Sequence, residues 1–191
     1  MKKIISLILC FTMVLSLFTG CTNKNGNTDS SSGDVIKIGV FEPLTGENGG
    51  GGSQELGGIK YANKIYSEVL GKKVELVIVD NKSDKGEATT AVTRLIEKDK
   101  VVAIIGSYGS GVSIAAGDII KKAKIPAMGA SCTNPMVTQG NDFYFRACFL
   151  DPFQGNVMAN YAINNGAKKA AVIMQNGDDY SVGRGNFFIK A

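Results

Sequence analysis

The chain has 191 residues, of which 44% are apolar and 20% are charged, which is typical of one globular domain or a small two-lobed one. It contains no histidine, which excludes Ser-His-Asp and Cys-His catalysis and every histidine-ligated metal site. The formal net charge is +4, and residues 1–20 contribute two lysines and no acid to it, so the remaining chain gives no argument for nucleic-acid binding.

The first twenty residues have the pattern of a secretory signal peptide. Lys2 and Lys3 precede the apolar run IISLILCFTMVLSLF, and small residues follow that run. The run is short and is interrupted by Ser and Thr, which disfavours a membrane-spanning helix. The pattern therefore predicts that the protein is exported.

Cys21 marks the predicted start of the mature chain. The junction LFTGC resembles a bacterial lipobox, in which the cysteine is lipidated, although Phe18 stands where Leu is usual. Lipid chains on Cys21 would hold the protein at a membrane surface without a spanning helix. The rest of residues 21–34 is rich in Asn, Ser, Thr and Gly, which predicts a flexible linker.

From Val35 onward the pattern alternates between strands and helices. Strands are predicted at residues 35–41, 73–80, 101–106, 125–130 and 169–175. A helix is predicted at 53–70 with Ser53 as its cap, and a second helix begins at Asp84 and Glu87, which resemble a capping box. Further helices are predicted after Ser110 and from residue 181 onward. The helix between them is predicted to begin with Asp151 as its cap and to end at Gly166. Alternation with short connections predicts an α/β fold with a parallel sheet and helices on both faces.

Ligands of such sheets bind at the carboxyl ends of the strands. The candidate loops are therefore those that leave the predicted strands, at 42–53, 80–84, 106–111, 130–141 and 176–181. Within the first of them, the run from Gly49 to Gly52 is typical of a flexible loop.

The segment IIGSYGSGVSIAAGDIIKK joins a predicted strand to a predicted helix through Ser, Gly and Tyr. A helix start carries free N–H groups and partial positive charge, and Ser110 with Gly109 and Gly111 leaves this one open to an anion. A phosphate loop would need Gly-Lys-Ser/Thr, and an acyl-enzyme elbow would need G-x-S-x-G with a histidine. Neither motif is present, so a carboxylate fits better.

A second polar loop, GASCTNPMVT, follows the next predicted strand. Ser110 and Thr133 can donate to a carboxylate, and the carbonyl of Ser131 can accept from an ammonium. An α-amino acid zwitterion requires both: donors for its carboxylate and an acceptor for its ammonium. Ordinary turns with satisfied hydroxyls explain the same residues equally well, so the chemistry alone leaves both interpretations open.

Cys132 and Cys148 are the thiols that remain after the predicted signal peptide and Cys21. They could pair in an exported protein, but the sequence does not supply the geometry, so the disulfide is left open. Two distant cysteines make a poor zinc site, and we expect neither a metal nor a cofactor.

The motifs IKIGVFEPLTG, VDNKSDKGEATTAVTRLIEKDKVVAIIG, ASCTNP, DPFQG and GDDYSVG, in this order, resemble the type I periplasmic binding proteins. More narrowly, they resemble the leucine/isoleucine/valine-binding lipoproteins of ABC importers, over residues 35–191. The resemblance implies a binding protein and not an enzyme. It also implies an amino-acid ligand, ABC permease membrane subunits as partners, a lipid anchor, no nucleic acid, and a location on the outer face of the bacterial cytoplasmic membrane or in the periplasm.

The resemblance also implies roles for particular residues. Ser110 and its neighbours, Tyr108 included, would hold the ligand carboxylate. The loop that contains Cys132 would hold carboxylate and ammonium, Ser131 by its backbone and Thr133 by its hydroxyl and N–H. Tyr180 would close over the ligand from the second lobe. The aromatic residue that the family often has in the first ligand-facing loop is replaced here by the glycine run.

The family's two-lobed plan implies an N-terminal ligand-binding lobe at 35–149 and the start of an incomplete second lobe at 150–191. The chain is therefore interpreted as an N-terminal fragment that binds its ligand only at millimolar strength or more weakly. Three alternatives stay open: a binder of amides or urea, a sensor domain of the same fold, and a non-functional product of a truncated gene.

Overall fold

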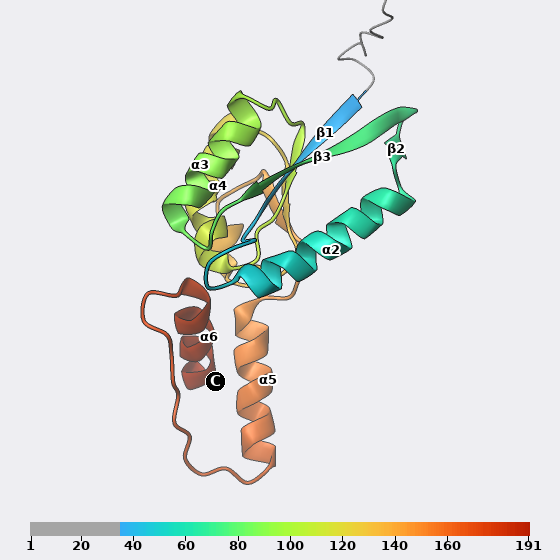
Figure 1. Cartoon of the computed structure of the whole chain (residues 1–191). Helices are drawn as coiled ribbons and strands as arrows, with labels where there is room; N and C mark the ends of the chain where they lie inside the picture. The colour runs from blue at the N-terminus through green and yellow to red at the C-terminus, as the bar shows by residue number, and fades with distance from the viewer. Residues whose placement is uncertain (1–34) are drawn as a thin grey trace, which may run out of the picture. The chain divides into compact units, whose positions relative to one another are not determined.

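The computed structural model describes residues 35–191, all of which belong to one structural unit (Figure 1). The predictions of a signal peptide, of lipidation at Cys21 and of a linker fall on residues 1–34 and lie outside the described residues. Among residues 35–191, no helix is both long enough and apolar enough to cross a membrane.

A six-stranded sheet forms the centre of the fold, in the order β2-β3-β1-β4-β5-β6. Its strands are β1 (Val35–Glu42), β2 (Glu68–Val69), β3 (Lys72–Asp80), β4 (Ala103–Ile105), β5 (Ala127–Gly129) and β6 (Tyr144–Arg146). All neighbouring pairs are parallel except β2 and β3. The predicted α/β class with a mostly parallel sheet is therefore confirmed.

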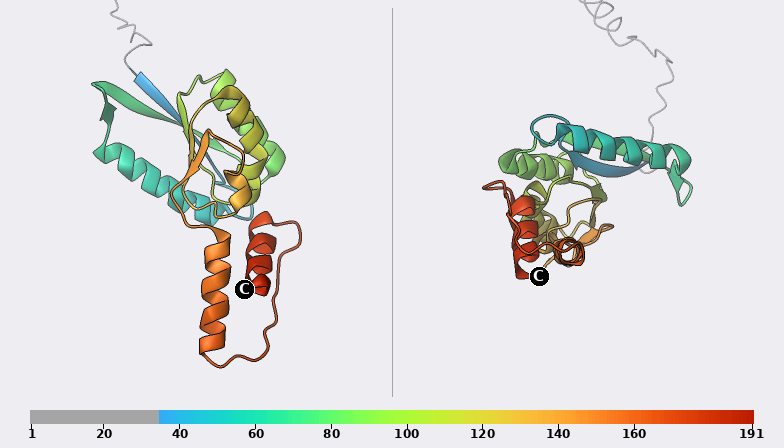
Figure 2. Two further views of the ribbon diagram at one scale, coloured as in Figure 1. Left: turned by 180° about the vertical axis from the view of Figure 1, so that it is seen from behind. Right: turned by 90° about the horizontal axis from the view of Figure 1, so that it is seen from below.

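Helices cover both faces of this sheet. The helices of residues 35–191 are α2 (Gly49–Ile65), α3 (Lys85–Glu97), α4 (Ser110–Ala123), α5 (Asp151–Asn164) and α6 (Asp179–Lys190), with a 3-10 turn at Pro135–Val137. α2 lies on one face and α3 with α4 on the other (Figure 2). α5 and α6 pack against each other beyond one end of the sheet.

The main core lies between the sheet and the pair α3 and α4. Phe41 and Ile104 from the strands meet Leu95 of α3 and Ile120 of α4, and all four side chains are almost fully buried. Tyr144 of β6 is also buried, and its hydroxyl donates to the carbonyl of Gly106 at 2.6 Å. This bond joins β6 to the loop that leaves β4.

The glycine run is the first turn of α2, so the predictions of a loop there and of a Ser53 cap are wrong. Sequence alone favours a loop because glycine is a poor helix former. The structure uses the missing side chains instead. A Cβ on Gly52 would collide with the carbonyl oxygen of Pro43, and a Cβ on Gly51 would lie 2.5 Å from the Tyr108 ring. Glycine therefore lets this turn lie flat on the neighbouring loops.

Replacing Gly52 by Ala is expected to destabilise the protein by about 1–3 kcal/mol, because the added methyl meets rigid backbone. Gly50 in the same turn is a matched control, since nothing lies within 4 Å of its ideal Cβ position. Gly50→Ala is expected to stabilise the protein by about 0.5–1 kcal/mol. Thermal unfolding of both variants checks the pair, and equal midpoints would contradict the packing argument.

The predicted strand at 169–175 is wrong, because these residues form no ladder with any described strand. Ile173 is 97% exposed, so the apolar run that indicated a strand is not buried in the described chain. Asp151 is the first residue of α5, and Leu150 holds the cap position in its place. Neither β2 nor β6 was predicted, and the helix predicted to extend to residue 70 ends at Ile65, before β2.

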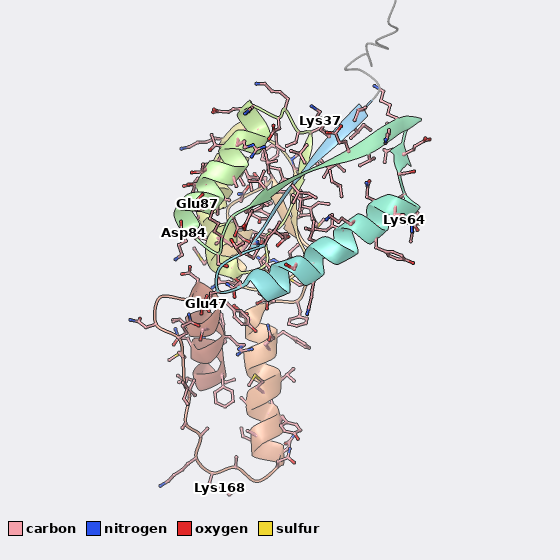
Figure 3. The ribbon with its side chains drawn as sticks, in the orientation of Figure 1. Lys37, Glu47, Lys64, Asp84, Glu87 and Lys168 are labelled. Carbon is pink, nitrogen blue, oxygen red and sulfur yellow. The ribbon has the colours of Figure 1, made fainter. Side chains whose placement is uncertain are left out.

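Two helix boundaries are confirmed. Asp84 caps α3 by accepting from the backbone N–H of Glu87 at 2.9 Å, and both residues lie at the start of that helix (Figure 3). The second half of the predicted capping box is not formed, because the Asp84 N–H donates to the carbonyl of Asn81 and the Glu87 carboxylate pairs with Lys82. α5 ends just before Gly166, whose φ of +83° breaks the helix as predicted.

Candidate ligand-binding site

A cavity of about 650 Å³ lies at the carboxyl ends of the strands, between the loops that leave them and helices α5 and α6. The predicted loops after β1, β4 and β5 and the predicted loop at 176–181 contribute to it, as expected for a ligand site at the carboxyl ends of parallel strands. The predicted loop at 80–84, after β3, does not line the cavity. The lining residues are Glu47, Asn48, Tyr108, Gly109, Ser110, Ala130, Ser131, Thr133, Cys148, Phe149, Gln154, Gln175, Asp178, Tyr180, Ser181 and Arg184.

The start of α4 faces this cavity. Gly109 holds the cap position with a φ of +97°, which favours glycine, and it has no side chain to cover the helix end. Ser110 follows, 1% exposed, and its Oγ accepts the backbone N–H of Asn134 at 3.2 Å. Since that bond uses a lone pair, the hydroxyl proton of Ser110 stays available for a ligand acceptor.

The loop after β5 brings Ser131 and Thr133 to the same cavity. The Ser131 Oγ is buried and has no hydrogen-bond partner among the described residues. The Thr133 Oγ1 donates to the Asp151 carboxylate at 2.6 Å, and the Asp151 N–H donates to the Thr133 carbonyl at 3.0 Å. The two residues therefore hold each other at the edge of the cavity.

Cys132, which was predicted to belong to the ligand loop, does not line the cavity. Its side chain is fully buried in the main core, because Ser131 and Thr133 turn toward the cavity on either side of it. Burial raises the pKa of the Cys132 thiol to about 11. Cys148 does line the cavity, and both thiols are free, so the structure shows no disulfide between them.

Arg146 of β6 fixes the loop after β5 from behind. Its guanidinium donates to the carbonyls of Cys132, Asn134 and Pro135 at 2.7, 3.0 and 3.3 Å, and to the Thr138 hydroxyl at 2.7 Å. A planar guanidinium can serve several carbonyls at once, which a lysine cannot do. Sequence reasoning missed this residue because nothing near it in the chain indicates its partners.

Buried polar groups join the strand ends beneath the cavity. Asn81 donates from Nδ2 to the carbonyl of Phe41 at 3.0 Å and to the Ser107 hydroxyl at 2.8 Å. Glu42, at the end of β1 and fully buried, accepts the backbone N–H of Tyr108 at 2.6 Å. These bonds fix the loop that carries Tyr108 and Ser110.

Burial raises the pKa of Glu42 to about 8, the N–H of Tyr108 opposes this rise, and the neighbouring Glu55 carboxyl adds to it. The folded state therefore holds a proton that the unfolded chain releases near its ordinary pKa of 4.5. Stability falls as the pH rises from about 4.5 to 8, because the folded state binds more protons across this range.

Glu42→Gln is expected to remove most of the loss of folding stability between low and high pH, which is on the order of 3 kcal/mol. The amide can still accept the N–H of Tyr108, and it carries no charge at any pH. Thermal unfolding at pH 5.5 and pH 9 measures the effect. Glu75→Gln, which removes a carboxylate from an exposed position on β3, is the control. An unchanged pH dependence in Glu42→Gln would contradict the assignment.

α6 and the segment before it form the opposite wall. Asp179 pairs with Lys85 of α3 at 2.8 Å. Glu47, in the loop after β1 (Figure 3), accepts from Nε2 of Gln175, in the segment before α6, at 2.9 Å. Tyr180 lines the cavity as expected from its place in the sequence. The guanidinium of Arg184 lies 4.7 Å from the centre of the Tyr180 ring and donates to its hydroxyl at 2.6 Å.

The ring of Tyr108 lies directly over Gly51 and also lines the cavity. The cavity wall beside Gly51 therefore contains an aromatic ring, although the first loop supplies none. An aromatic ring reaches it from the loop after β4, and it fits because Gly51 has no side chain.

The structure thus brings Tyr108, Ser110, Ser131, Thr133 and Tyr180 together, and leaves Cys132 outside. Other lining residues were missed. Glu47, Asn48 and Asp178 belong to loops that the sequence predicted to be ligand-facing, so their position in those loops could have indicated them. Phe149, Gln154 and Arg184 lie on segments with no such indication in the sequence.

Residues 35–186 match the family described as "Periplasmic binding protein". The chain belongs to this family. The match covers most of the sequence and ends within α6. The resemblance that the motifs indicate is therefore confirmed at the level of the family.

Several members of the periplasmic binding protein family are similar to this chain. The leucine-binding protein LivK of Thermotoga maritima has 46% sequence identity and a TM-score of 0.80, over 81% of this chain and 45% of that one. The branched-chain amino acid transporter substrate-binding protein LivJ of Streptococcus pneumoniae, solved with isoleucine, has 32% identity and a TM-score of 0.77, over 82% and 46%. An amino acid binding protein of Pseudomonas aeruginosa is 32% identical over 78% of this chain and 41% of its own length. This chain thus spans less than half the length of these relatives.

Proposed function

We propose that this chain provides ligand-binding residues of an extracytoplasmic solute-binding protein that captures a branched-chain amino acid for an ABC transporter. The observation that carries the proposal is the start of α4, where Ser110 and the open helix end face a cavity of suitable size. A helix N-terminus with a free hydroxyl proton favours a carboxylate.

The walls of the cavity support an apolar side chain on that ligand. Tyr108, Ala130 and Phe149 line it together with the polar groups of the loops. Pockets for small molecules usually combine such apolar walls with a few polar groups that fix orientation. LivK, a leucine-binding protein, and LivJ, a branched-chain amino acid transporter substrate-binding protein, support the same ligand class. Permease subunits as partners and lipid anchoring through Cys21 belong to this proposal.

Ligand titrations of the full chain, followed by the amide NMR signals of Ser110 and Thr133, test the proposal. Leucine, isoleucine and valine are expected to shift these signals at millimolar concentrations, and urea and acetamide are not. A response to urea or acetamide alone would favour an amide-binding protein. No response to any amino acid would contradict the proposed ligand class.

A further inference from the structure

Exposed lysines gather at the amino end of the sheet, which is the end opposite the cavity. Val35 at the start of β1 lies opposite Lys73 of β3. The N–H of Val102, just before β4, donates to the carbonyl of Lys37 at 3.0 Å. The end of α4 joins them, because it leads into β5, the parallel neighbour of β4. These segments form a surface that we call the basic face, and its lysines are Lys37, Lys72, Lys73, Lys98, Lys100, Lys121, Lys122 and Lys124.

The positive charge of the basic face is not neutralised within the described chain. None of the ion pairs found in residues 35–191 includes one of its lysines. Acids at this end of the sheet are fewer than the eight lysines, and Asp99 is already paired with Arg94 at 3.2 Å. They are Glu68, Glu75, Glu97, Asp99 and Asp142. The loops and helix starts at the cavity end carry mainly acids, which are Glu47, Asp80, Asp84, Asp178 and Asp179. The two ends of the folded unit therefore differ in the sign of their charge.

The basic face lies where the chain enters the folded unit, at the start of β1 (Figure 1). Only residues 22–34 separate Cys21, the proposed lipid anchor, from Val35. Those residues contain one lysine and two aspartates, so they add no net positive charge of their own. Figure 3 shows Lys37 at this end of the folded unit and Lys168 at the opposite end. An anchor at Cys21 therefore holds the basic face closer to the bilayer than the cavity.

An anionic bilayer is the partner whose charge fits this face. Its surface is negative over a wide area, and each lysine close to such a surface strengthens binding roughly fivefold. Ammonium groups on flexible stems suit charge that is spread in this way, whereas a built phosphate site usually uses the planar fork of arginine. The basic face consists of lysines, and Arg94 beside it is paired with Asp99. Stable attachment to a membrane commonly combines lipidation with a basic patch of this kind.

We propose that the basic face binds the surface of an anionic bilayer, and that it thereby orients the anchored protein with its cavity facing away from the membrane. Lipid at Cys21 limits the distance of the protein from the bilayer, and the basic face sets which end lies against it. A cavity that faces away stays open to ligand from solution. The inference goes beyond the proposed function, and it does not depend on which ligand the cavity binds.

The test measures binding of the full chain to lipid vesicles by flotation. Vesicles of phosphatidylcholine alone are compared with vesicles that also contain the anionic lipid phosphatidylglycerol. Lipid chains and apolar segments contribute equally to both, so a difference between the two reports on charge. The wild type is expected to bind the anionic vesicles at least about tenfold more tightly. Raising the ionic strength from about 0.1 M to about 1 M should remove most of this difference, because the screening length falls from about 10 Å to about 3 Å.

Two pairs of adjacent lysines provide a matched comparison. Lys72 and Lys73 belong to the basic face, whereas Lys168 and Lys169 lie at the opposite end, and all four are exposed. Lys72→Gln with Lys73→Gln is expected to weaken binding to the anionic vesicles about tenfold and to leave binding to the neutral vesicles unchanged. Lys168→Gln with Lys169→Gln removes the same net charge far from the basic face, and it should bind the anionic vesicles within about threefold of the wild type.

Lys98→Gln with Lys122→Gln tests the basic face from two other segments and is expected to give the same loss, so a folding defect at the start of β3 does not leave the question open. Equal binding of the wild type to both kinds of vesicle would overturn the inference, and so would equal losses from lysine pairs at the two ends. Tighter binding of soluble inorganic polyphosphate than of anionic vesicles would also overturn it, because the face would then recognise a soluble polyanion. None of these results bears on the leucine titrations, so the proposed function would stand.

Discussion

Replacing Arg146 by Leu is expected to destabilise the protein by about 3 kcal/mol, which lowers the midpoint of thermal unfolding by roughly 6–12 °C. The guanidinium serves three carbonyls and one hydroxyl of residues 132–138. Without it, carbonyls of a largely buried loop lose their donors, and leaving such groups unpaired costs more than an average hydrogen bond contributes.

Arg146→Lys is expected to recover only part of this loss, because an ammonium cannot reach all four acceptors at once. Arg94→Leu is the control, since Arg94 is half exposed and, within residues 35–191, forms a single ion pair, with Asp99 at 3.2 Å. Although Asp99 is only 17% exposed, the loss of this single pair with a half-exposed arginine is expected to cost about 1 kcal/mol, less than the loss of the four bonds of Arg146. Similar midpoints for Arg146→Leu and Arg94→Leu would show that the loop does not depend on the guanidinium.

Replacing Ser110 by Ala is expected to weaken leucine binding by about 10-fold to 100-fold, because the ligand carboxylate loses a charge-assisted hydrogen bond. The helix itself should persist, since alanine is a good helix former. NMR titration with leucine measures the change. The loss should be as large for 4-methylpentanoate, which has the carboxylate and branched chain of leucine without the ammonium, because Ser110 is proposed to bind the carboxylate.

Ser113→Ala provides a matched control for this experiment. Ser113 is buried in the same helix and its hydroxyl donates to the carbonyl of Gly109 at 3.0 Å, but it does not line the cavity. Its replacement should lower stability and leave the affinity for leucine within about threefold of the wild type. Wild-type affinity for leucine in Ser110→Ala would contradict the proposal that the ligand carboxylate binds at the start of α4.

Local patterns in the sequence predicted most of the sheet and the helices on it. The apolar runs of β1 and β3 are long, and the cap at Asp84 and the stop at Gly166 depend on neighbouring residues only. The rule that ligands bind at the carboxyl ends of parallel strands then placed Ser110, Ser131 and Thr133 near one another. Such features need no knowledge of distant contacts.

The errors have a common physical reason, which is that distant contacts override local preference. The glycine run is helical because Pro43 and Tyr108 lie against it. The run at 169–175 looks like a buried strand, but it has no partner strand in the described chain. Asp151 resembles a helix cap, yet its carboxylate accepts from Thr133.

The sequence by itself determined the α/β class, the family resemblance and four of the five loops predicted to line the site, because periodicity and turn residues act over short distances. Only the tertiary structure decided which side chains of those loops reach the cavity, and with what polarity. In the folded chain Cys132 is buried in the core, Arg146 donates to the loop after β5, and the Thr133 hydroxyl donates to Asp151. Hydrogen-bond direction depends on partners that are far apart in the chain, and for that reason it cannot be read from residue order.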